Sequence, residues 1–416
     1  MNALLTRSLG GAALVGLVAT AALAQTVAIT GGTVYPVSGP KIERGTVVIT
    51  NGTITAVGAN VPVPAGAKVV DASGKWVTPG LIHANASAGT GVAHLGGLGD
   101  AAKQGDVNPS FNLADGIDPQ AFSIPITRTG GVTTGVLNPN GPFLPGVSVA
   151  VDFAGDRLEQ MLVHSPAALK LVLTNGSRGA GGGSRAGTIA RLKQLFADAL
   201  EYDRRRLEYR RHATQDLSAP ASELEALLPA LRGLVPVVVT ANRRIDLENA
   251  LRLGKEYHLK LVLAGAVEGW QIAKEIAAAG VPVVMEPNED IPSFDGLGAR
   301  LDNATLLREA GVKVVIAQDD PGGERNLRYA AGNAVRNGMS WDDALKAITL
   351  WPAEAFGLTR YGSLGVGKVG DVVVWSGDPF EFSSAAEKVF IRGQETSLHT
   401  RENELRDRYR TLPPAR

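Results

Sequence analysis

The sequence has 416 residues, no cysteine and equal numbers of basic and acidic side chains, 41 of each. The zero formal charge argues against nucleic acid or an anionic membrane surface as a partner, and the lack of cysteine excludes disulfides and a lipid-modified cysteine. The length allows two domains or one large α/β barrel with additions.

The N-terminus has the pattern of a secretory signal. Arg7 precedes an apolar run that extends from Leu9 to Leu23, and Ala22-Leu23-Ala24 matches the small-residue pattern of a cleavage site. This predicts a signal peptide over residues 1–24. The alternative is an uncleaved membrane anchor, but the apolar run is short for a span. We therefore expect a periplasmic or secreted protein with no membrane span after cleavage.

The two ends of the mature chain are predicted to be rich in β-strands. Residues 45–58 carry Asn51-Gly52 between two alternating β-branched runs, which is a strong short-range hairpin signal. Residues 369–395 again contain strand-like runs separated by turn residues. These β-rich ends flank a middle region with a different pattern.

From about residue 81 to 358, apolar strand-like runs alternate with helical periodicity. Four Val-, Ile- and Leu-rich runs begin near residues 235, 259, 281 and 312, about one strand and one crossover helix apart. Continuous apolar runs are typical of parallel strands that are buried on both faces. The pattern predicts a (β/α)8 TIM barrel, with an open doubly wound sheet as the alternative. Ser340, followed by Asp343, is predicted to cap a helix.

In a parallel barrel the functional side chains gather at the carboxyl ends of the strands. The first barrel strand ends in His83-Ala84-Asn85-Ala86-Ser87, where alternate residues share one face. The predicted pocket at the barrel mouth comprises residues from four strand ends: His83, Asn85, Ser87, Thr240, Ala264 and Gln318.

Three motifs give the chain a family resemblance. VTPGLIHANAS at 77–87, QDDPGG at 318–323 and GSLGVGKVGDVVVWSGDP at 362–379 together resemble the amidohydrolase superfamily, in particular its imidazolonepropionase-like and prolidase-like branch. The resemblance covers essentially the whole mature chain. It implies an amidohydrolase-like TIM barrel over 81–358, and a small β-sandwich domain built from 25–80 and 359–396. Residues 397–416 form a charged C-terminal tail.

The resemblance also implies a metal site, whose histidines this chain lacks. In the family, histidines and a carboxylate hold one or two divalent metals, and the metal lowers the pKa of the bound water that attacks a C–N bond. The family's first two histidines fall on Asn85 and Ser87, its fifth-strand histidine on Thr240, and its sixth-strand histidine on Ala264 or Gly265. All four expected histidines are absent.

Two family positions keep a functional side chain. Asp319 matches the last-strand aspartate that moves the proton of the attacking water, and it is the candidate catalytic residue. Lys170 could match the fourth-strand lysine that becomes carboxylated and bridges two metals. The alternative roles are structural: Asp319 caps the next helix or pairs with Arg325, and Lys170 is paired at a strand end.

His83, Lys170 and Asp319 are the residual metal-ligand candidates, and His94 could join a rebuilt site. A lone inward histidine is more often a hydrogen-bonded core residue. We expect no metal cofactor, or a divalent metal such as Zn if the family activity is retained.

The leading hypothesis is therefore an exported, degenerate amidohydrolase-family protein that acts as the partner subunit of an intact amidohydrolase in a homo- or hetero-oligomer. One alternative is an active metal-dependent hydrolase of amide or cyclic-amide C–N bonds. The other is a periplasmic small-molecule binding protein whose pocket, lined by Asn85, Ser87, Thr240 and Gln318, forms hydrogen bonds instead of binding metal.

Overall fold

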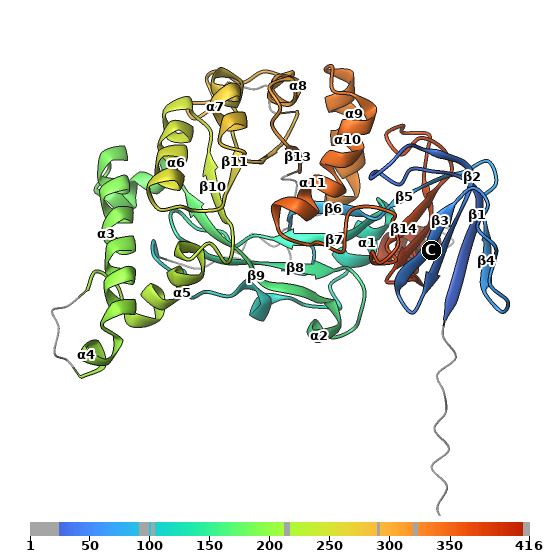
Figure 1. The fold of residues 1–416 in the computed structure, drawn as a ribbon, viewed down its shortest axis with the longest axis horizontal. Coiled ribbons are helices and arrows are strands. Elements are labelled where there is room, and N and C mark those ends of the chain that lie inside the picture. The colour runs from blue at the N-terminus through green and yellow to red at the C-terminus, as the bar shows by residue number, and fades with distance from the viewer. Residues whose placement is uncertain are drawn as a thin grey trace, which may run out of the picture.

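The computed structural model describes residues 25–90, 100, 105–211, 217–288, 292–318 and 323–410. Figure 1 shows a helix-covered α/β barrel beside a second body made of strands. Two separate sheets and two hydrophobic clusters correspond to these bodies, and they confirm the predicted fold class. Within the described ranges, no helix is long and apolar enough to cross a membrane. The predicted signal peptide, His94 and Asp319 lie outside these ranges.

The smaller body interleaves strands from both ends of the chain. Its sheet has the order β16-β15-β14-β5-β1-β2-β3, and β4 pairs with β1. The strands are β1 (Thr26–Val34), β2 (Ile42–Thr50), β3 (Thr53–Gly58), β4 (Lys68–Asp71), β5 (Trp76–Pro79), β14 (Val372–Trp375), β15 (Ala386–Ile391) and β16 (Gln394–Glu395). The predicted hairpin at Asn51-Gly52 joins β2 to β3, and both turn residues have positive φ, 49° and 76°.

In the barrel sheet, strands that are neighbours in space are also consecutive in the chain, in the order β13-β12-β11-β10-β9-β8-β7-β6. Its strands are β6 (Leu81–Ala86), β7 (Val132–Leu137), β8 (Gly146–Asp152), β9 (Leu162–Val172), β10 (Val237–Ala241), β11 (Leu261–Gly265), β12 (Val283–Met285) and β13 (Val314–Ile316). A doubly wound sheet would reverse its strand order at a switch point, so the sequential order excludes that alternative. The Gln318 N–H lies 3.4 Å from His83 Nε2, which brings the end of β13 beside β6.

One barrel strand departs from the predicted parallel sheet. β8 runs antiparallel to both β7 and β9. Residues 138–145 alone connect β7 to β8, which is too short for a parallel crossover of about a dozen residues. The direction of β8 therefore follows from the length of its connection, while β7 and β9 keep the parallel direction.

Helices cover the outer face of the barrel (Figure 1). The α-helices are α1 (Ser123–Thr129), α2 (Leu158–Met161), α3 (Arg185–Arg204), α4 (Arg206–Arg210), α5 (Ala221–Leu231), α6 (Arg244–Glu256), α7 (Ala273–Ala278), α8 (Asn303–Glu309), α9 (Leu327–Arg336), α10 (Trp341–Ala347), α11 (Leu350–Ala355) and α12 (Arg401–Tyr409). The 3-10 helices are η2 (Leu113–Gly116), η3 (Asn175–Gly181), η4 (Gly269–Ile272) and η5 (Glu324–Asn326). The predicted cap of α10 is confirmed, because the Asp343 N–H donates to Ser340 Oγ at 3.1 Å.

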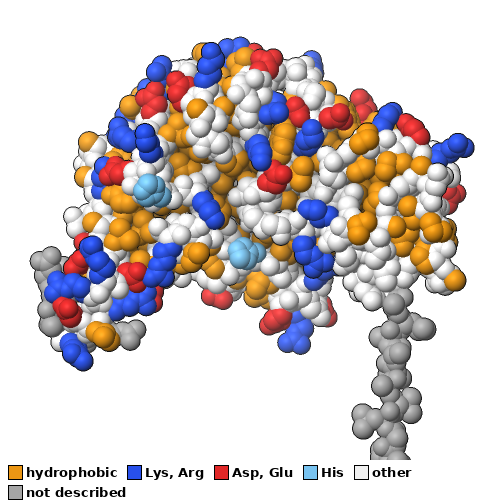
Figure 2. Space-filling model, in the orientation of Figure 1, with side chains coloured by type: hydrophobic (Ala, Val, Ile, Leu, Met, Phe, Trp, Pro, Cys, Tyr) orange, Lys and Arg blue, Asp and Glu red, His pale blue; other side chains and the backbone are white. Residues whose placement is uncertain are grey.

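The surface carries charges of both signs. On the face drawn in Figure 2, Lys and Arg side chains are interspersed with Asp and Glu side chains over the barrel. Many of the exposed charges are paired, for example Lys193 with Glu256 at 2.7 Å and Arg232 with Asp203 at 2.6 Å. This mixture agrees with the zero formal charge of the sequence.

A buried pair of carboxyl groups joins the barrel to the smaller sheet. Thr134 Oγ1 lies 3.0 Å from Asp152 Oδ1 and 3.3 Å from Asp371 Oδ2. The Tyr361 hydroxyl donates to Asp152 at 3.1 Å, and the Arg392 N–H donates to Asp371 at 2.8 Å. Arg392 Nε also lies 3.3 Å from Asp152 Oδ2. One guanidinium balances only one of two buried carboxylates, and one hydroxyl proton cannot serve both, so the geometry favours a proton on one carboxyl group. Burial, followed by the charge of Asp371, raises the pKa of Asp152 to about 8, and burial also raises the pKa of Asp371.

This carboxyl pair predicts how stability depends on pH. A carboxyl whose pKa is raised in the native state binds a proton that the unfolded chain loses above its ordinary pKa near 4, so this contribution to stability is lost as pH rises from about 4 to about 8. Asp152→Asn should make Tm fall less steeply as pH rises, and each kcal/mol corresponds to roughly 1 °C in a chain of 416 residues. The exposed Asp156→Asn is the control, and an unchanged slope in Asp152→Asn would contradict the shared proton.

Candidate functional site at the barrel mouth

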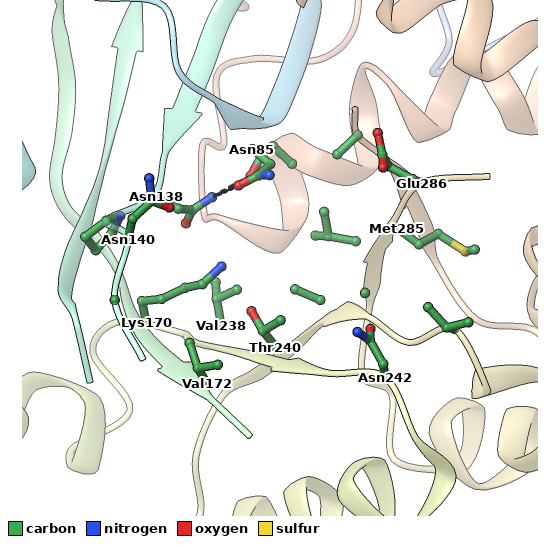
Figure 3. Close-up of a pocket in the computed structure, with 18 of the residues that line it drawn as sticks. Asn85, Asn138, Asn140, Lys170, Val172, Val238, Thr240, Asn242, Met285 and Glu286 are labelled. Carbon is green, nitrogen blue, oxygen red and sulfur yellow. Dashed lines mark hydrogen bonds between the residues drawn. The ribbon is translucent and has the colours of Figure 1, made fainter. Parts of the chain in front are cut away.

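A cavity of about 320 Å³ opens at the carboxyl ends of the barrel strands. Its described polar lining comes from five barrel strands or the residues that follow them, together with the first residue of α8: Asn85, Asn138, Asn140, Lys170, Thr240, Asn242, Glu286 and Asn303. Apart from Asn303, these side chains are labelled around the cavity in Figure 3. This is the place where a barrel of this kind positions its chemistry.

The structure places some of the predicted pocket residues around this cavity. Asn85, Thr240 and Ala264 line it, and so does Lys170 from the middle of the sheet, where it pairs in register with Val238. The other three, His83, Ser87 and Gln318, are not among the lining residues in the described part of the chain. The functional roles assigned to all of them stay predictions.

His83 is fully buried in β6. Its Nδ1 lies 3.2 Å from the Asn85 N–H, and its Nε2 lies 3.4 Å from the Gln318 N–H. A neutral imidazole has only one acceptor nitrogen, so the ring can accept only one of these two bonds. The shorter contact favours acceptance at Nδ1. The ring therefore fits the role of a hydrogen-bonded core residue between β6 and β13.

Ser87, at the family's second histidine position, is held by a carboxylate. Its N–H and its hydroxyl both donate to Glu324 Oε1, at 2.9 and 2.8 Å. Glu324 begins η5 and is only 2% exposed, and its second oxygen, Oε2, has no hydrogen-bond partner among the described residues. Sequence reasoning missed Glu324, whose only signal was its place just after QDDPGG.

Asn85, at the first histidine position, is fixed by a second amide. Asn138 Nδ2 donates to Asn85 Oδ1 and to the Ala84 carbonyl, both at 3.0 Å. Ser148 in turn donates to Asn138 Oδ1 at 2.7 Å. This chain of hydrogen bonds from β8 through Asn138 to β6 orients the Asn85 amide at the rim (Figure 3).

The family's sixth-strand histidine falls on Ala264 or Gly265, and at Gly265 a neighbouring side chain takes up the space. Gly265 has φ of +82°, and a Cβ added to it would lie 2.1 Å from Asn242 Oδ1. Asn242 therefore fills the space that any side chain at position 265 would need. Asn242 was also missed from the sequence, although it lies two residues beyond Thr240, on the same alternating face of the chain.

The described residues do not fit the family's metal centre. No three His, Asp or Glu side chains come together among them in a way that could hold a metal ion. Among the described residues, the cavity lining offers amides, a hydroxyl, one lysine and one carboxylate, Glu286, whereas zinc prefers imidazole, thiolate and carboxylate ligands. Of the other histidines, His164 lines a separate cavity with residues that precede β10 to β13, and His258 precedes β11.

Comparisons with known proteins agree with this fold. A sequence profile described as amidohydrolase family matches residues 270–396. Amidohydrolase tasK of Hapsidospora irregularis is 24% identical over 386 residues, covering 84% of this chain and 39% of that protein. The chain thus spans about two fifths of the length of this curated relative.

Solved structures extend the comparison over the whole barrel. An amidohydrolase from Thermotoga maritima has a TM-score of 0.82 at 27% identity, covering 89% of this chain and 99% of its own. A prolidase complexed with N-methylphosphonate-L-proline has a TM-score of 0.59 at 18% identity, covering 90% and 100%. Molinate hydrolase has a TM-score of 0.56 at 20% identity, covering 90% and 95%; these two show the fold alone.

The barrel, its interleaved side sheet and the cavity at the strand ends define a scaffold of the amidohydrolase type. With the profile match and the similarity to the Thermotoga maritima protein, they show that this chain belongs to the amidohydrolase superfamily. The resemblance drawn from the three sequence motifs is therefore confirmed.

The contact between Gly265 and Asn242 predicts an unusual mutational coupling. Gly265→Ala should destabilise the protein by about 2–4 kcal/mol, because it combines a positive φ with overpacking against Asn242. Asn242→Ala should relieve the overpacking, so the double variant should be more stable than Gly265→Ala alone in urea unfolding. Gly280→Ala is the matched control, since Gly280 has φ of +65° and open space around its Cβ position. Additive effects would contradict the contact.

Proposed function

We propose that this chain is a degenerate amidohydrolase whose barrel mouth binds a small polar molecule and does not carry out metal-dependent hydrolysis. One observation carries the proposal: two positions of the family histidines, Asn85 and Ser87, belong to a different hydrogen-bonded arrangement beside the cavity at the strand ends. Asn85 is fixed by Asn138, Ser87 by Glu324, and the space beside Gly265 is filled by Asn242.

This arrangement supports binding over simple decay of a metal site. On the β6 side, Asn85 and Ser87 have partners from other segments, so two positions of the lost histidines hold hydrogen-bonded polar side chains. On the β10 side, Thr240 Oγ1 and Asn242 Oδ1 have no partner among the described residues, and a bound ligand with donor groups would satisfy them. Here the rim amides are oriented by neighbours that come from other strands. Oriented amides, a lysine and a carboxylate in a concave site are the groups with which binding proteins recognise polar ligands.

The sequence supports the remaining parts of the hypothesis, which are export, the role of partner subunit and the domain limits. Residues 1–24 and the Ala22-Leu23-Ala24 pattern support export, and the loss of four histidines from an intact scaffold is compatible with service as a partner subunit of a complete amidohydrolase. We also propose the domain limits 25–80 with 359–396, and 81–358. The strands of the two sheets fall within these limits.

Metal analysis tests the proposal. Purified protein dialysed after incubation with zinc should retain far less than one divalent ion per chain by elemental analysis, because the described rim supplies too few metal-ligating side chains. Zinc should also leave Tm unchanged, since a ligand that binds the native state would raise it. One or two tightly bound Zn, Fe or Mn ions per chain would overturn the degenerate interpretation.

Turnover tests the active-hydrolase alternative directly. We expect no hydrolysis of amides or cyclic amides above the rate without protein, and no difference between the natural chain and Asp319→Asn, because the proposed site activates no water. Metal-dependent turnover that Asp319→Asn abolishes while Tm stays constant would instead establish Asp319 as the catalytic residue.

A further inference from the structure

The polar groups of the cavity are distributed unevenly around it. Glu286 follows β12. Thr240 and Asn242 lie two residues apart at the end of β10, where alternate residues share one face. Lys170 enters from β9, and Figure 3 shows it across the cavity from Glu286. One side of the cavity therefore presents a carboxylate, and the other presents an ammonium group.

Two orphaned atoms lie on the wall that β10 contributes. Thr240 Oγ1 and Asn242 Oδ1 are closed to solvent and have no hydrogen-bond partner among the described residues. Native proteins keep few such atoms, and each needs an explanation. Both residues line the cavity. A ligand with N–H donors would satisfy both oxygens.

The opposite wall carries the cationic group of the cavity. The Asn138 amide N–H groups are engaged with Ala84 and Asn85. The Lys170 side chain also interacts within the protein, and its ammonium group attracts a carboxylate or another anion from the cavity. A volume of about 320 Å³ is at the lower end for ligand pockets, and it holds a molecule of roughly ten non-hydrogen atoms.

We infer that the ligand is a small zwitterion of the amino-acid type, with its ammonium group toward Glu286, Thr240 and Asn242 and its carboxylate toward Lys170. This inference rests on the proposed binding function and names its ligand class. Two charged walls bind a molecule with both charges better than one that carries either charge alone, because the second charge is bound without a further loss of translational freedom.

Matched probes test this inference by calorimetry on the whole chain. The zwitterions 4-aminobutanoate and 6-aminohexanoate are compared with butanoate, hexanoate, butylamine and hexylamine. At least one zwitterion should bind about tenfold more tightly than both singly charged probes of its length. A singly charged probe that binds as well as its zwitterion would overturn the inference while the binding function stands.

Variants assign the two ends of the ligand. Glu286→Gln should weaken the zwitterion and the amine about tenfold and spare the carboxylate, whereas Lys170→Met should do the reverse and Lys170→Arg should restore part of the affinity. Glu354→Gln, whose carboxylate lies with the residues that precede the barrel strands, is the control. Equal losses for all probes would overturn the assignment. If no probe binds, the inferred ligand class is wrong. If the rim is also found to hold a tightly bound metal, the proposed binding function is wrong as well.

Discussion

The structure depends on one constraint: the barrel brings the carboxyl ends of its parallel strands to a single rim, and the polar groups buried there need partners. The sequential order of the barrel strands creates that rim. In metal-dependent relatives of this architecture, a metal and its ligands meet part of this demand. In this chain side chains meet part of the demand, through the pairs Asn85–Asn138 and Ser87–Glu324, while Thr240 Oγ1 and Asn242 Oδ1 have no partner among the described residues.

The two sides of the rim differ in which hydrogen-bonding groups they leave available to a ligand. Both N–H donors of the Asn138 amide are used and its oxygen accepts from Ser148, so the orientation of this amide on the β6 side of the rim is fixed. On the β10 side, Thr240 and Asn242 keep unsatisfied oxygens, which makes that wall adaptable. A rim with one fixed wall and one adaptable wall suits recognition of a small molecule.

Much of the fold could be predicted from local sequence signals. The hairpin at Asn51-Gly52, the helix cap at Ser340 and the apolar runs of β10 to β13 each depend on a few neighbouring residues. The reversed direction of β8 was missed, because an apolar strand has the same pattern in either direction. The short connection over residues 138–145 contained that information.

The site was harder to predict, since its contacts join distant parts of the chain. Asn85, Thr240, Ala264 and Lys170 were located from their places at strand ends and from the family motif. Glu324 meets Ser87 across 237 positions, and Asn242 meets Gly265 on a neighbouring strand end. No local pattern announces such pairs, because the packing of the barrel decides which side chains face each other.

The most direct test of metal-independent binding is a crystal structure of the protein grown with millimolar zinc and a small zwitterion, with diffraction recorded at the zinc absorption edge. The account predicts no anomalous peak at the rim and ordered ligand density between Lys170 and Glu286. An anomalous peak bound by Lys170, His83 or Asp319 would contradict it and would show that the barrel mouth is still a metal site.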